Sequence, residues 1–545
     1  MFRVGKLRLK PFRFLIPKFP RYGPIAFALI GGVLMGLTPA PVNAWFLAWV
    51  ALVPLWVLVA KSSSLKSKLA LGFVWGLGFH GLALSWITGL HPLTWMGVPW
   101  LASLAIALFC WLFITAWGAL LVLIWAGSFK LLERSNPRAA NARFLPLVRV
   151  LMSVAVWCVL EGIWSSGALW WTSLSYTQSP HNLLILHLGQ LTGPSAATAA
   201  IVAVNGLLAE AWLARSHPPE PLPSHAHTSS SDTSAKLYLA IAATLLLGLH
   251  LLGFGLYSRP LTQPPETAVR VGLIQGNVPT RIKLYEEGVR RAFNAYMTGY
   301  DILADQNVDI VFTPEGALPI YWMPSIYQSN PVYQSLLNRG VPLILGSFGR
   351  QDEQITQSLF AIAGNGEMVG RYNKVKLVPL GEYIPFGQFL GSLINRLSPV
   401  EASMIPGELE QQFDTPVGRA IAGICYESAF SKLFRVQAAN GGEFILTASN
   451  NDPYSSTMMF QHHAQDVMRA IETDRWAARV TNTGYSGIVD PHGKTRWLSD
   501  NNIYEIHADT IYRRQTRSLY VQWGDWLTPL LLISALTVGL GIRIN

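Results

Sequence analysis

The long apolar runs of this chain constrain its fold more than any other feature. Each run is long enough for the ~20 residues that an α-helix needs to cross a lipid bilayer. Charged residues make up only 13% of the 545 residues, about half the fraction usual in soluble proteins. We therefore expect a multi-span α-helical membrane domain of about eight helices, at residues 22–41, 44–60, 69–90, 98–127, 147–165, 190–214, 237–257 and 521–542.

Basic residues alternate between the segments that connect these runs. Lys and Arg are concentrated in 1–21, 61–68 and 128–146, whereas 38–43 and 91–97 contain none. Because cytoplasmic loops carry the excess of Lys and Arg, the N-terminus and the even-numbered loops are expected in the cytoplasm. The chain between the seventh and eighth spans is then expected outside the cytoplasm, and the basic N-terminus 1–21 is expected to lead into a retained signal anchor. The net charge of +10 lies mostly in such segments, which argues against nucleic acid as a partner.

Two connecting regions differ in composition from the apolar runs. Residues 215–236 are rich in Pro, Ser and His and are predicted to be a disordered cytoplasmic loop within the transmembrane region 22–257. We do not expect the histidines of this loop, His217, His225 and His227, to bind a metal. Residues 268–515 have the composition of a soluble α/β domain, and the final span 521–542 follows it.

Apolar strands alternate with amphipathic helices in the region 268–515. A layered sheet with helices packed on it is the expected result. The predicted strands are 269–278, 309–315, 341–348, 358–364, 420–427 and 443–449, the predicted helices are 283–304 and 461–478, and 479–494 is predicted to form a hairpin.

Three residues at strand ends or in loops of this domain have the chemistry of a nucleophilic site. Cys425 ends an apolar strand, Glu315 ends another, and Lys374 lies in a loop rich in Pro and Gly. A thiol with a pKa near 8.5 needs a base to become a nucleophile, and Glu315 is a candidate. An ammonium such as Lys374 stabilises a thiolate and a tetrahedral oxyanion. On residue types alone, the alternative of a buried strand cysteine, a capping glutamate and a surface lysine stays open.

The segments around these residues resemble the nitrilase superfamily, whose members use Glu, Lys and Cys in that order. The segments are FTPEGA, YNKVKLVPLGEYIPF and GICYE. More narrowly, nearly the whole chain resembles the bacterial apolipoprotein N-acyltransferases. This second resemblance rests also on LTPAPVNAWFLAWVAL, GFVWGLGFHGLALSWI, LSYTQ, GLIQGNVP, QHHAQDVMRA and TNTGYSG.

The resemblance implies a fold and roles for particular residues. It implies eight spans and an extracytoplasmic nitrilase-like domain of the α-β-β-α sandwich type, inserted before the last span. Glu315 would be the general base, Lys374 the oxyanion stabiliser and Cys425 the nucleophile. Glu382 would support the lysine and the base. Tyr426 and Glu427 match the family's CYE and would shape the pocket, although simple loop packing is the alternative.

The resemblance also implies a reaction and a location. The acyl chain of a membrane phospholipid would pass through a cysteine thioester to the α-amino group of an S-diacylglyceryl-cysteine at a lipoprotein N-terminus. This is the last step of lipoprotein maturation, and it takes place at the bacterial plasma (inner) membrane. Neither a cofactor nor a metal is expected, and the enzyme is expected to be a monomer.

The sequence departs from the family pattern in places. The usual SNDAWFG is Ser449–Ser455 here, SNNDPYS, without its Trp; Leu284 stands where an aromatic is expected; and the Arg after Glu161 is missing. These changes concern substrate admission rather than the catalytic residues. Glu161 itself lies in an apolar run, where an acid is either paired for structural reasons or used on a lipid path.

Two other functions are compatible with the same residues. A membrane-anchored amidase of the nitrilase type would use Glu315, Lys374 and Cys425, but one anchoring helix would suffice for it. A transporter or lipid-binding protein with an inactive nitrilase-like domain would have no reason to keep all three residues. The acyltransferase interpretation accounts for both the spans and the site.

Overall fold

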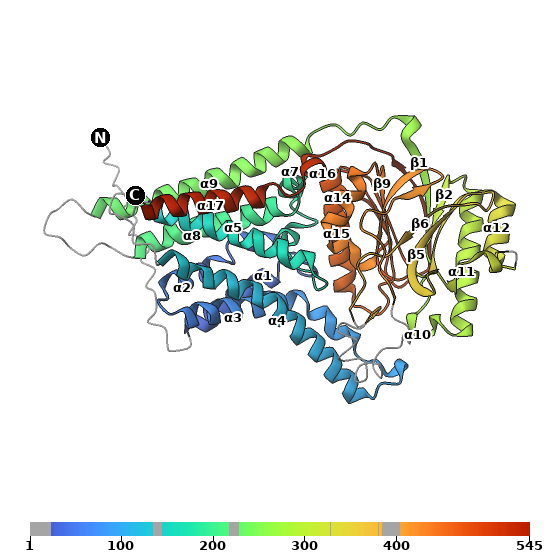
Figure 1. Ribbon diagram of the computed structural model, residues 1–545, viewed down its shortest axis with the longest axis horizontal. Helices are drawn as coiled ribbons and strands as arrows, with labels where there is room; N and C mark the ends of the chain where they lie inside the picture. Colours follow the sequence, from blue (N-terminus) through green and yellow to red (C-terminus); the bar gives the residue numbers. More distant parts are fainter. Residues whose placement is uncertain are drawn as a thin grey trace, which may run out of the picture.

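The computed structural model describes residues 23–133, 144–216, 228–327, 329–379, 381–383 and 404–544. Figure 1 shows an elongated molecule with a bundle of helices at one end and a layered α/β domain at the other. We call the bundle the helical body. The predicted basic N-terminus 1–21 and the three histidines of the predicted loop lie outside the described residues.

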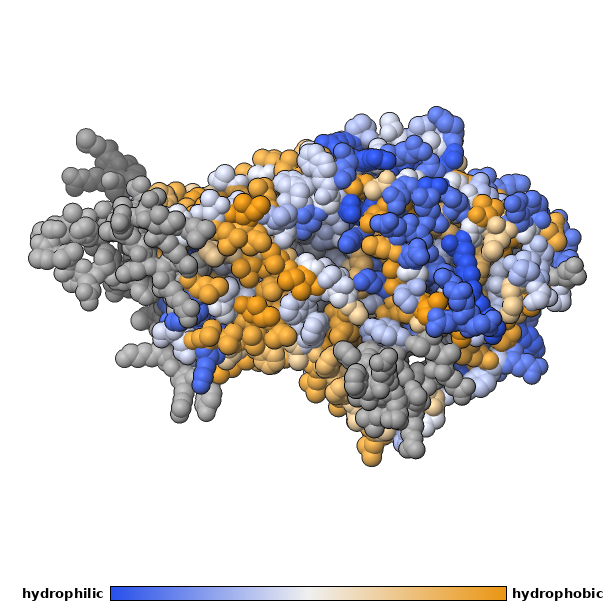
Figure 2. All heavy atoms as spheres, in the orientation of Figure 1, coloured by the Kyte–Doolittle hydropathy of each residue, from blue (hydrophilic) through white to orange (hydrophobic). Residues whose placement is uncertain are grey.

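A helix lies at each of the eight predicted spans. These helices are α1 (Gly23–Gly36), α2 (Val53–Lys61), α3 (Leu65–Ala83), α4 (Trp100–Glu133), α5 (Leu145–Ser166), α8 (Ser195–Ser216), α9 (Thr228–Tyr257) and α17 (Leu527–Ile544). Within the described ranges, α4, α5, α8 and α9 are the four that are long and apolar enough to cross a membrane. The bundle is therefore that of a membrane protein, and Figure 2 shows apolar side chains gathered over it, while most of the hydrophilic ones lie on the α/β domain.

Short helical turns connect or precede these helices. They are η1 (Trp45–Trp49), η2 (Ser85–Leu90), η3 (Thr94–Met96), η5 (Ser175–Gln178), α6 (Leu183–His187), α7 (Gly189–Thr192) and α16 (Leu519–Trp523). The second and third predicted spans are thus each divided into an α-helix and a 3₁₀ turn.

Helix α9 begins earlier than the sequence suggested. Residues 228–236 of the predicted disordered loop are helical, because α9 starts at Thr228. An ion pair between Asp232 and Lys236, 2.6 Å apart and one turn from each other, stabilises this first part of the helix. The prediction that the loop extends to residue 236 was wrong at that end.

Glycines let α1 pack closely against α3, as expected for helices in lipid. A Cβ atom on Gly32 would lie 2.0 Å from the Trp75 carbonyl oxygen, and one on Gly36 would lie 2.8 Å from the Leu82 Cβ. Any larger side chain at Gly32 would force the two helices apart.

The α/β domain contains two sheets. Its strands are β1 (Ala268–Gln275), β2 (Ile310–Phe312), β3 (Leu318–Tyr321), β4 (Leu343–Gln351), β5 (Gln354–Ile362), β6 (Met368–Asn373), β7 (Phe413–Thr415), β8 (Gly418–Ile424), β9 (Phe444–Ser449), β10 (Ala477–Thr481), β11 (Gly487–Val489), β12 (Thr495–Leu498) and β13 (Glu505–Tyr512). One sheet has the order β13-β1-β2-β4-β5-β6, with β3 paired to β4, and the other has the order β12-β11-β10-β9-β8-β7. The centre of each is parallel: β1 with β2 and β4, and β8 with β9 and β10.

Helices cover the outer faces of both sheets. The helices and turns of the domain are η6 (Pro265–Thr267), α10 (Thr280–Lys283), α11 (Glu286–Asp305), η7 (Pro324–Ile326), α12 (Pro331–Arg339), η8 (Cys425–Ala429), α14 (Ser431–Ala439) and α15 (Ser456–Thr473). One apolar core lies between the two sheets, and a second lies between the first sheet and α11 and α12. A third core joins α14 and α15 to the helical body, so this helix layer lies between the second sheet and the bundle (Figure 1). The predicted α-β-β-α arrangement is confirmed.

Glu161 is buried in α5 and hydrogen-bonded by neutral groups. Its carboxylate accepts from the Trp157 indole at 3.2 Å, and from Ser173 Oγ, the Leu174 amide and Thr198 Oγ1 at 2.8 Å each. It therefore fastens α5 to the loop that follows it and to α8, which agrees with the pairing interpretation.

Candidate active site

The predicted catalytic residues follow strands of both sheets. Glu315 follows β2 and Lys374 follows β6 in the first sheet, and Cys425 follows β8 in the second. Lys374 Nζ donates to Glu315 Oε1 at 2.9 Å and to Glu382 Oε1 at 2.5 Å. Cys425 is close enough for its charge to interact with those of Lys374 and Glu315. The structure thus brings together all four residues from three separate segments.

Lys374 is a buried cation held between two carboxylates. Burial alone would lower the pKa of its amine, but the charges of Glu315, Glu382 and Cys425 together raise it well above its usual value. Burial raises the pKa of Glu382 although Lys374 opposes this change. The second oxygen of Glu382 accepts from the Val378 amide at 2.8 Å, and that of Glu315 from the Asn450 amide at 3.0 Å. The ammonium therefore stays protonated and fixed in place.

Cys425 is a buried thiol on an unusual backbone. Burial raises the pKa of the thiol, the charge of Glu315 raises it further, and Lys374 acts in the opposite direction. The resting side chain is therefore the thiol, and it needs a base before it can attack. Its backbone has φ +53°, in the left-handed region that residues other than glycine rarely adopt. Such sharp turns place a nucleophile at the end of its strand.

Glu427 connects the segments that carry Lys374 and Cys425. It is fully buried and accepts from the amides of Val375, Lys376 and Ile424 at 2.5, 3.0 and 2.6 Å. Burial raises its pKa to about 7, although these backbone donors oppose the change. Through these contacts, Glu427 joins the segment after Lys374 to the end of the strand before Cys425.

Tyr426 attaches the site to the helical body. Its hydroxyl donates to the Ala168 carbonyl at 2.7 Å and accepts from the Trp170 amide at 2.8 Å. Its ring stacks parallel to that of Trp171, with centroids 6.2 Å apart. The residue after the candidate nucleophile is thus anchored on the loop that follows α5.

Three residues near the site were not singled out as site residues by the sequence. Lys283 is buried and its Nζ lies 3.4 Å from the Glu315 carbonyl oxygen. His462 of α15 lies 2.7 Å from the Cys425 carbonyl oxygen. Tyr454, in the altered SNNDPYS loop, packs against Trp86 with ring centroids 5.5 Å apart. Burial and the neighbouring Cys425 raise the pKa of Tyr454, which places this aromatic beside the site despite the missing Trp.

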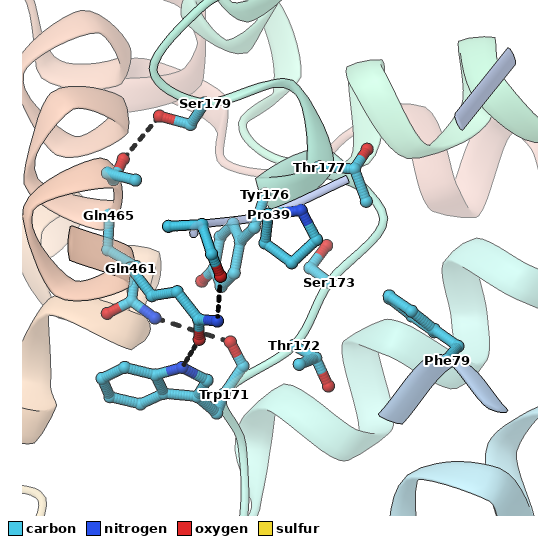
Figure 3. Close-up of a pocket in the computed structure, with 12 residues that line it drawn as sticks. Pro39, Phe79, Trp171, Thr172, Ser173, Tyr176, Thr177, Ser179, Gln461 and Gln465 are labelled. Carbon is cyan, nitrogen blue, oxygen red and sulfur yellow. Dashed lines mark hydrogen bonds between the residues drawn. The ribbon is translucent and has the colours of Figure 1, made fainter. Parts of the chain in front are cut away.

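A pocket lies between α15 and the helical body (Figure 3). Gln461 crosses it: its amide nitrogen donates to the carbonyls of Ala40 and Ala83 at 2.9 Å each, and its oxygen accepts from the Trp171 indole at 2.8 Å. Ser179 Oγ donates to the Ala464 carbonyl at 2.6 Å. None of the predicted catalytic residues lines it, so this pocket belongs to the contact between the two parts of the molecule.

No group of three or more His, Cys, Asp and Glu side chains that could hold a metal is found among the described residues.

Comparison with known proteins separates the chain into two matching parts. Residues 31–207 match the apolipoprotein N-acyltransferase N-terminal domain, and residues 270–501 match the carbon-nitrogen hydrolase family. An amidase from Nesterenkonia sp. is 17% identical, with a TM-score of 0.35, over 50% of this chain and 99% of its own. The α/β domain therefore corresponds to the part of the chain that matches the carbon-nitrogen hydrolase family.

Full-length relatives identify the chain further. It is 53% identical over 502 residues to an apolipoprotein N-acyltransferase from Nostoc sp., with 91% of this chain and 95% of the relative covered. It is 46% identical to one from Synechocystis sp., with 92% and 97% covered. The chain belongs to the apolipoprotein N-acyltransferase family, and it is an acyltransferase that acts in lipoprotein maturation. The family expectation from the sequence is confirmed.

Proposed function

We propose that this enzyme transfers an acyl chain from a membrane phospholipid, through a thioester on Cys425, to the free α-amino group of an S-diacylglyceryl-cysteine at a lipoprotein N-terminus. The observation that carries the proposal is the position of Lys374, whose ammonium bridges Glu315 and Glu382 beside the buried Cys425 thiol. This arrangement supplies a base, an oxyanion stabiliser and a nucleophile within one buried site.

The first half-reaction forms the thioester. Glu315 accepts the thiol proton while the Cys425 sulfur attacks the carbonyl carbon of a phospholipid ester. The negative charge on the carbonyl oxygen is stabilised by Lys374. The intermediate collapses when the bond between the carbonyl carbon and the glycerol oxygen breaks. Glu315 returns its proton to that oxygen, and a lysophospholipid leaves.

The second half-reaction forms the amide. The neutral amine of the lipoprotein cysteine attacks the thioester carbon, and Lys374 again stabilises the oxyanion. Glu315 accepts one proton of the amine, the carbon–sulfur bond breaks, and the proton returns to the Cys425 sulfur. Glu382 keeps Lys374 in place through both steps. The burial of Cys425 limits water access, which protects the thioester until the amine arrives.

The position of the site next to the helical body suits substrates that are anchored in a membrane. Burial of an acyl chain contributes about 0.8 kcal/mol per CH₂. We propose that residues 22–257 and 521–542 form eight spans of the bacterial inner membrane, that residues 268–515 form the catalytic domain, and that this domain lies on the periplasmic side. The alternation of basic segments supports this orientation. A monomer is sufficient, because the site residues come from one chain.

The test is the intact mass of detergent-purified enzyme after incubation with a phospholipid. We expect an acyl adduct that hydroxylamine removes, and we expect none on Cys425→Ala. An adduct that persists on Cys425→Ala would contradict the assignment of the nucleophile. Release of free fatty acid without any adduct, or no reaction by the folded enzyme, would favour hydrolase or inactive-scaffold functions.

The orientation has its own test. A reporter that is active only outside the cytoplasm, fused after residue 268, is expected to be active. A cytoplasmic reporter active at the same position would overturn the periplasmic placement.

A further inference from the structure

A buried histidine outside the proposed catalytic set contacts the backbone of the nucleophile. His462 lies on α15, is fully buried, and its Nε2 is 2.7 Å from the carbonyl oxygen of Cys425. The half-reactions above do not use this imidazole. Its neighbour His463 is also buried, but its Nε2 lies 2.9 Å from Thr495 Oγ1 instead.

The hydrogen bonds of His462 select one tautomer. Its Nδ1 lies 2.7 Å from Nη2 of Arg479. A guanidinium donates only, so Nδ1 must accept, and the ring proton is then on Nε2, facing a carbonyl oxygen that accepts only. In the opposite tautomer, an N–H would face the N–H of Arg479, and a lone pair would face the lone pairs of the Cys425 carbonyl.

The same surroundings disfavour the doubly protonated, positively charged form of the His462 imidazole. Arg479 is itself a buried cation, and its charge is already matched by Asp466, to which it donates. Burial first, and then the charge of Arg479, lower the pKa of His462 to about 3 although Asp466 opposes this change. The imidazole is therefore neutral at physiological pH.

Asn451 fits this assignment once its amide is turned. Its Oδ1 lies 3.3 Å from His462 Nδ1, and its Nδ2 is buried without a partner among the described residues. The oxygen and nitrogen of an amide exchange places on a half-turn of the side chain. The turned amide directs Nδ2, instead of the lone pairs of an oxygen, towards Nδ1, whose one lone pair is shared between the short Arg479 contact and the longer Asn451 contact.

We infer that His462 is a positioning residue that holds the backbone of the nucleophile through a hydrogen bond from Nε2–H to the Cys425 carbonyl. Cys425 has φ +53°, a left-handed conformation that is strained for residues other than glycine. A peptide unit is planar and trans, so fixing the Cys425 carbonyl also fixes the Tyr426 N–H in the opposite direction. The buried Arg479–Asp466 pair in turn fixes the imidazole.

The nucleophile is thereby held from two sides. His462 holds its carbonyl from α15, and the Tyr426 hydroxyl holds the next residue against Ala168 and Trp170 of the helical body. The loss of either contact frees one side of a strained turn. Since a misplacement of about 1 Å at a reacting group costs roughly 100-fold in rate, we expect the His462 bond to affect the chemical step.

Replacement by amides of two lengths tests the inference. In His462→Gln, the amide oxygen and nitrogen have nearly the spacing of the two ring nitrogens and can accept from Arg479 and donate to Cys425. In His462→Asn, the side chain is one methylene shorter and reaches only the Arg479 side. His463→Asn is the matched control on the same helix. The inference rests on Cys425 as the proposed nucleophile, so two readouts are needed.

The first readout is the rate of thioester formation from phospholipid, and the second is the rate of Cys425 alkylation by iodoacetamide. We expect His462→Asn to lower the maximal rate of thioester formation by roughly 10–100-fold without changing the half-saturating phospholipid concentration. We expect His462→Gln to stay within roughly threefold of the native enzyme, and His463→Asn to keep the native rate. The alkylation rates should follow the same order.

Equal rates for His462→Gln and His462→Asn, whether both native or both low, would overturn the inference. The first outcome would mean that the contact is irrelevant, and the second that the imidazole does something an amide cannot. Alkylation separates this failure from failure of the proposed function. If the native enzyme forms no thioester, alkylation of Cys425 by the folded variants still decides whether His462 positions it.

Discussion

Two buried glutamates in different parts of the molecule show how the same side chain serves different ends. Glu161 in the helical body and Glu315 in the α/β domain are 9% and 8% exposed. Four neutral donors satisfy Glu161, whereas Glu315 shares the ammonium of Lys374 with Glu382. The neutral donors around Glu161 hold its carboxylate in a structural role, in which it joins neighbouring segments of the helical body. A cation that two carboxylates share holds each carboxylate in a fixed position. In the site, this places Glu315 where it can accept the proton of the Cys425 thiol.

Among the substitutions that test this comparison, Glu315→Gln is expected to have the largest effect on activity. Without a base for the thiol, the rate of acyl transfer should fall by about 100–10,000-fold. The measurement is the rate of N-acylation of a diacylglyceryl peptide in detergent. Glu161→Gln is the control, because it makes the same chemical change in the helical body. Similar activities for the two variants would mean that Glu315 is not the base.

Lys374→Met should come next, with an effect on stability as well as activity. It leaves two carboxylates close together without their cation, and breaking a buried ion pair costs about 3–5 kcal/mol. We expect a matching loss in the free energy of unfolding of the α/β domain. Hydrogen exchange of the backbone amides of the α/β domain in increasing denaturant, against the exposed Lys494→Met as a control, measures it. An unchanged stability would show that the ion triad contributes nothing to the fold.

Lys283→Met tests a buried lysine whose pKa is lowered by burial more than it is raised by the nearby acids. Burial lowers the pKa of Lys283 to about 8, although Glu315 and Asp452 oppose this change. From pH 8 up to its usual range near 10.5, the unfolded chain binds more protons than the folded one, so native stability rises with pH. At pH 7 the methionine variant should be more stable by roughly 3 kcal/mol. This advantage should shrink as pH rises towards 10.5.

Thermal unfolding of both proteins between pH 7 and 10 measures the Lys283 effect. A constant difference across this range would mean that Lys283 keeps its proton in the folded state.

Glu161→Gln should have the smallest effect. Ser173 and Thr198 can rotate their hydroxyls to accept from the new amide nitrogen, while the amide oxygen still accepts from Trp157 and Leu174. We expect a cost below about 1 kcal/mol, against several kcal/mol for Glu161→Leu, which leaves these donors unpaired. Thermal stability in detergent distinguishes the two variants. A large loss with Gln would show that the negative charge of Glu161, rather than its hydrogen bonds, stabilises the helical body.

The fold was predictable where apolar patterning is continuous. The strand predicted at 443–449 is β9, Phe444–Ser449, because every residue of it is buried. The helix predicted at 461–478 ends at Thr473 instead, since Asp474 adopts φ +55°. Strand β13 was missed because its half-buried, polar sequence has no apolar run, and it is recognised only by its pairing with β1.

The candidate site was predictable from local motifs but its supporting contacts were not. Lys374 and Glu382 share one motif, and Cys425 shares another with Glu427. His462 and Lys283 meet the site through contacts with residues 37 and 32 positions away. The QHHAQDVMRA segment contains both His462 and His463, and only the helix orientation shows which of the two faces Cys425.

The hydrogen bonds of Gln461 have a consequence for synthesis of the chain. The Ala40 carbonyl, to which the Gln461 side chain donates, is synthesised 421 residues earlier than Gln461. At translation rates of roughly 5–20 residues per second, this carbonyl waits roughly 20–80 s for its donor. The first helices therefore have to persist in the bilayer as an incomplete assembly until α15, and later α17, have been made. The order of the elements along the chain thus separates in time the formation of the helical body from its contacts with the α/β domain.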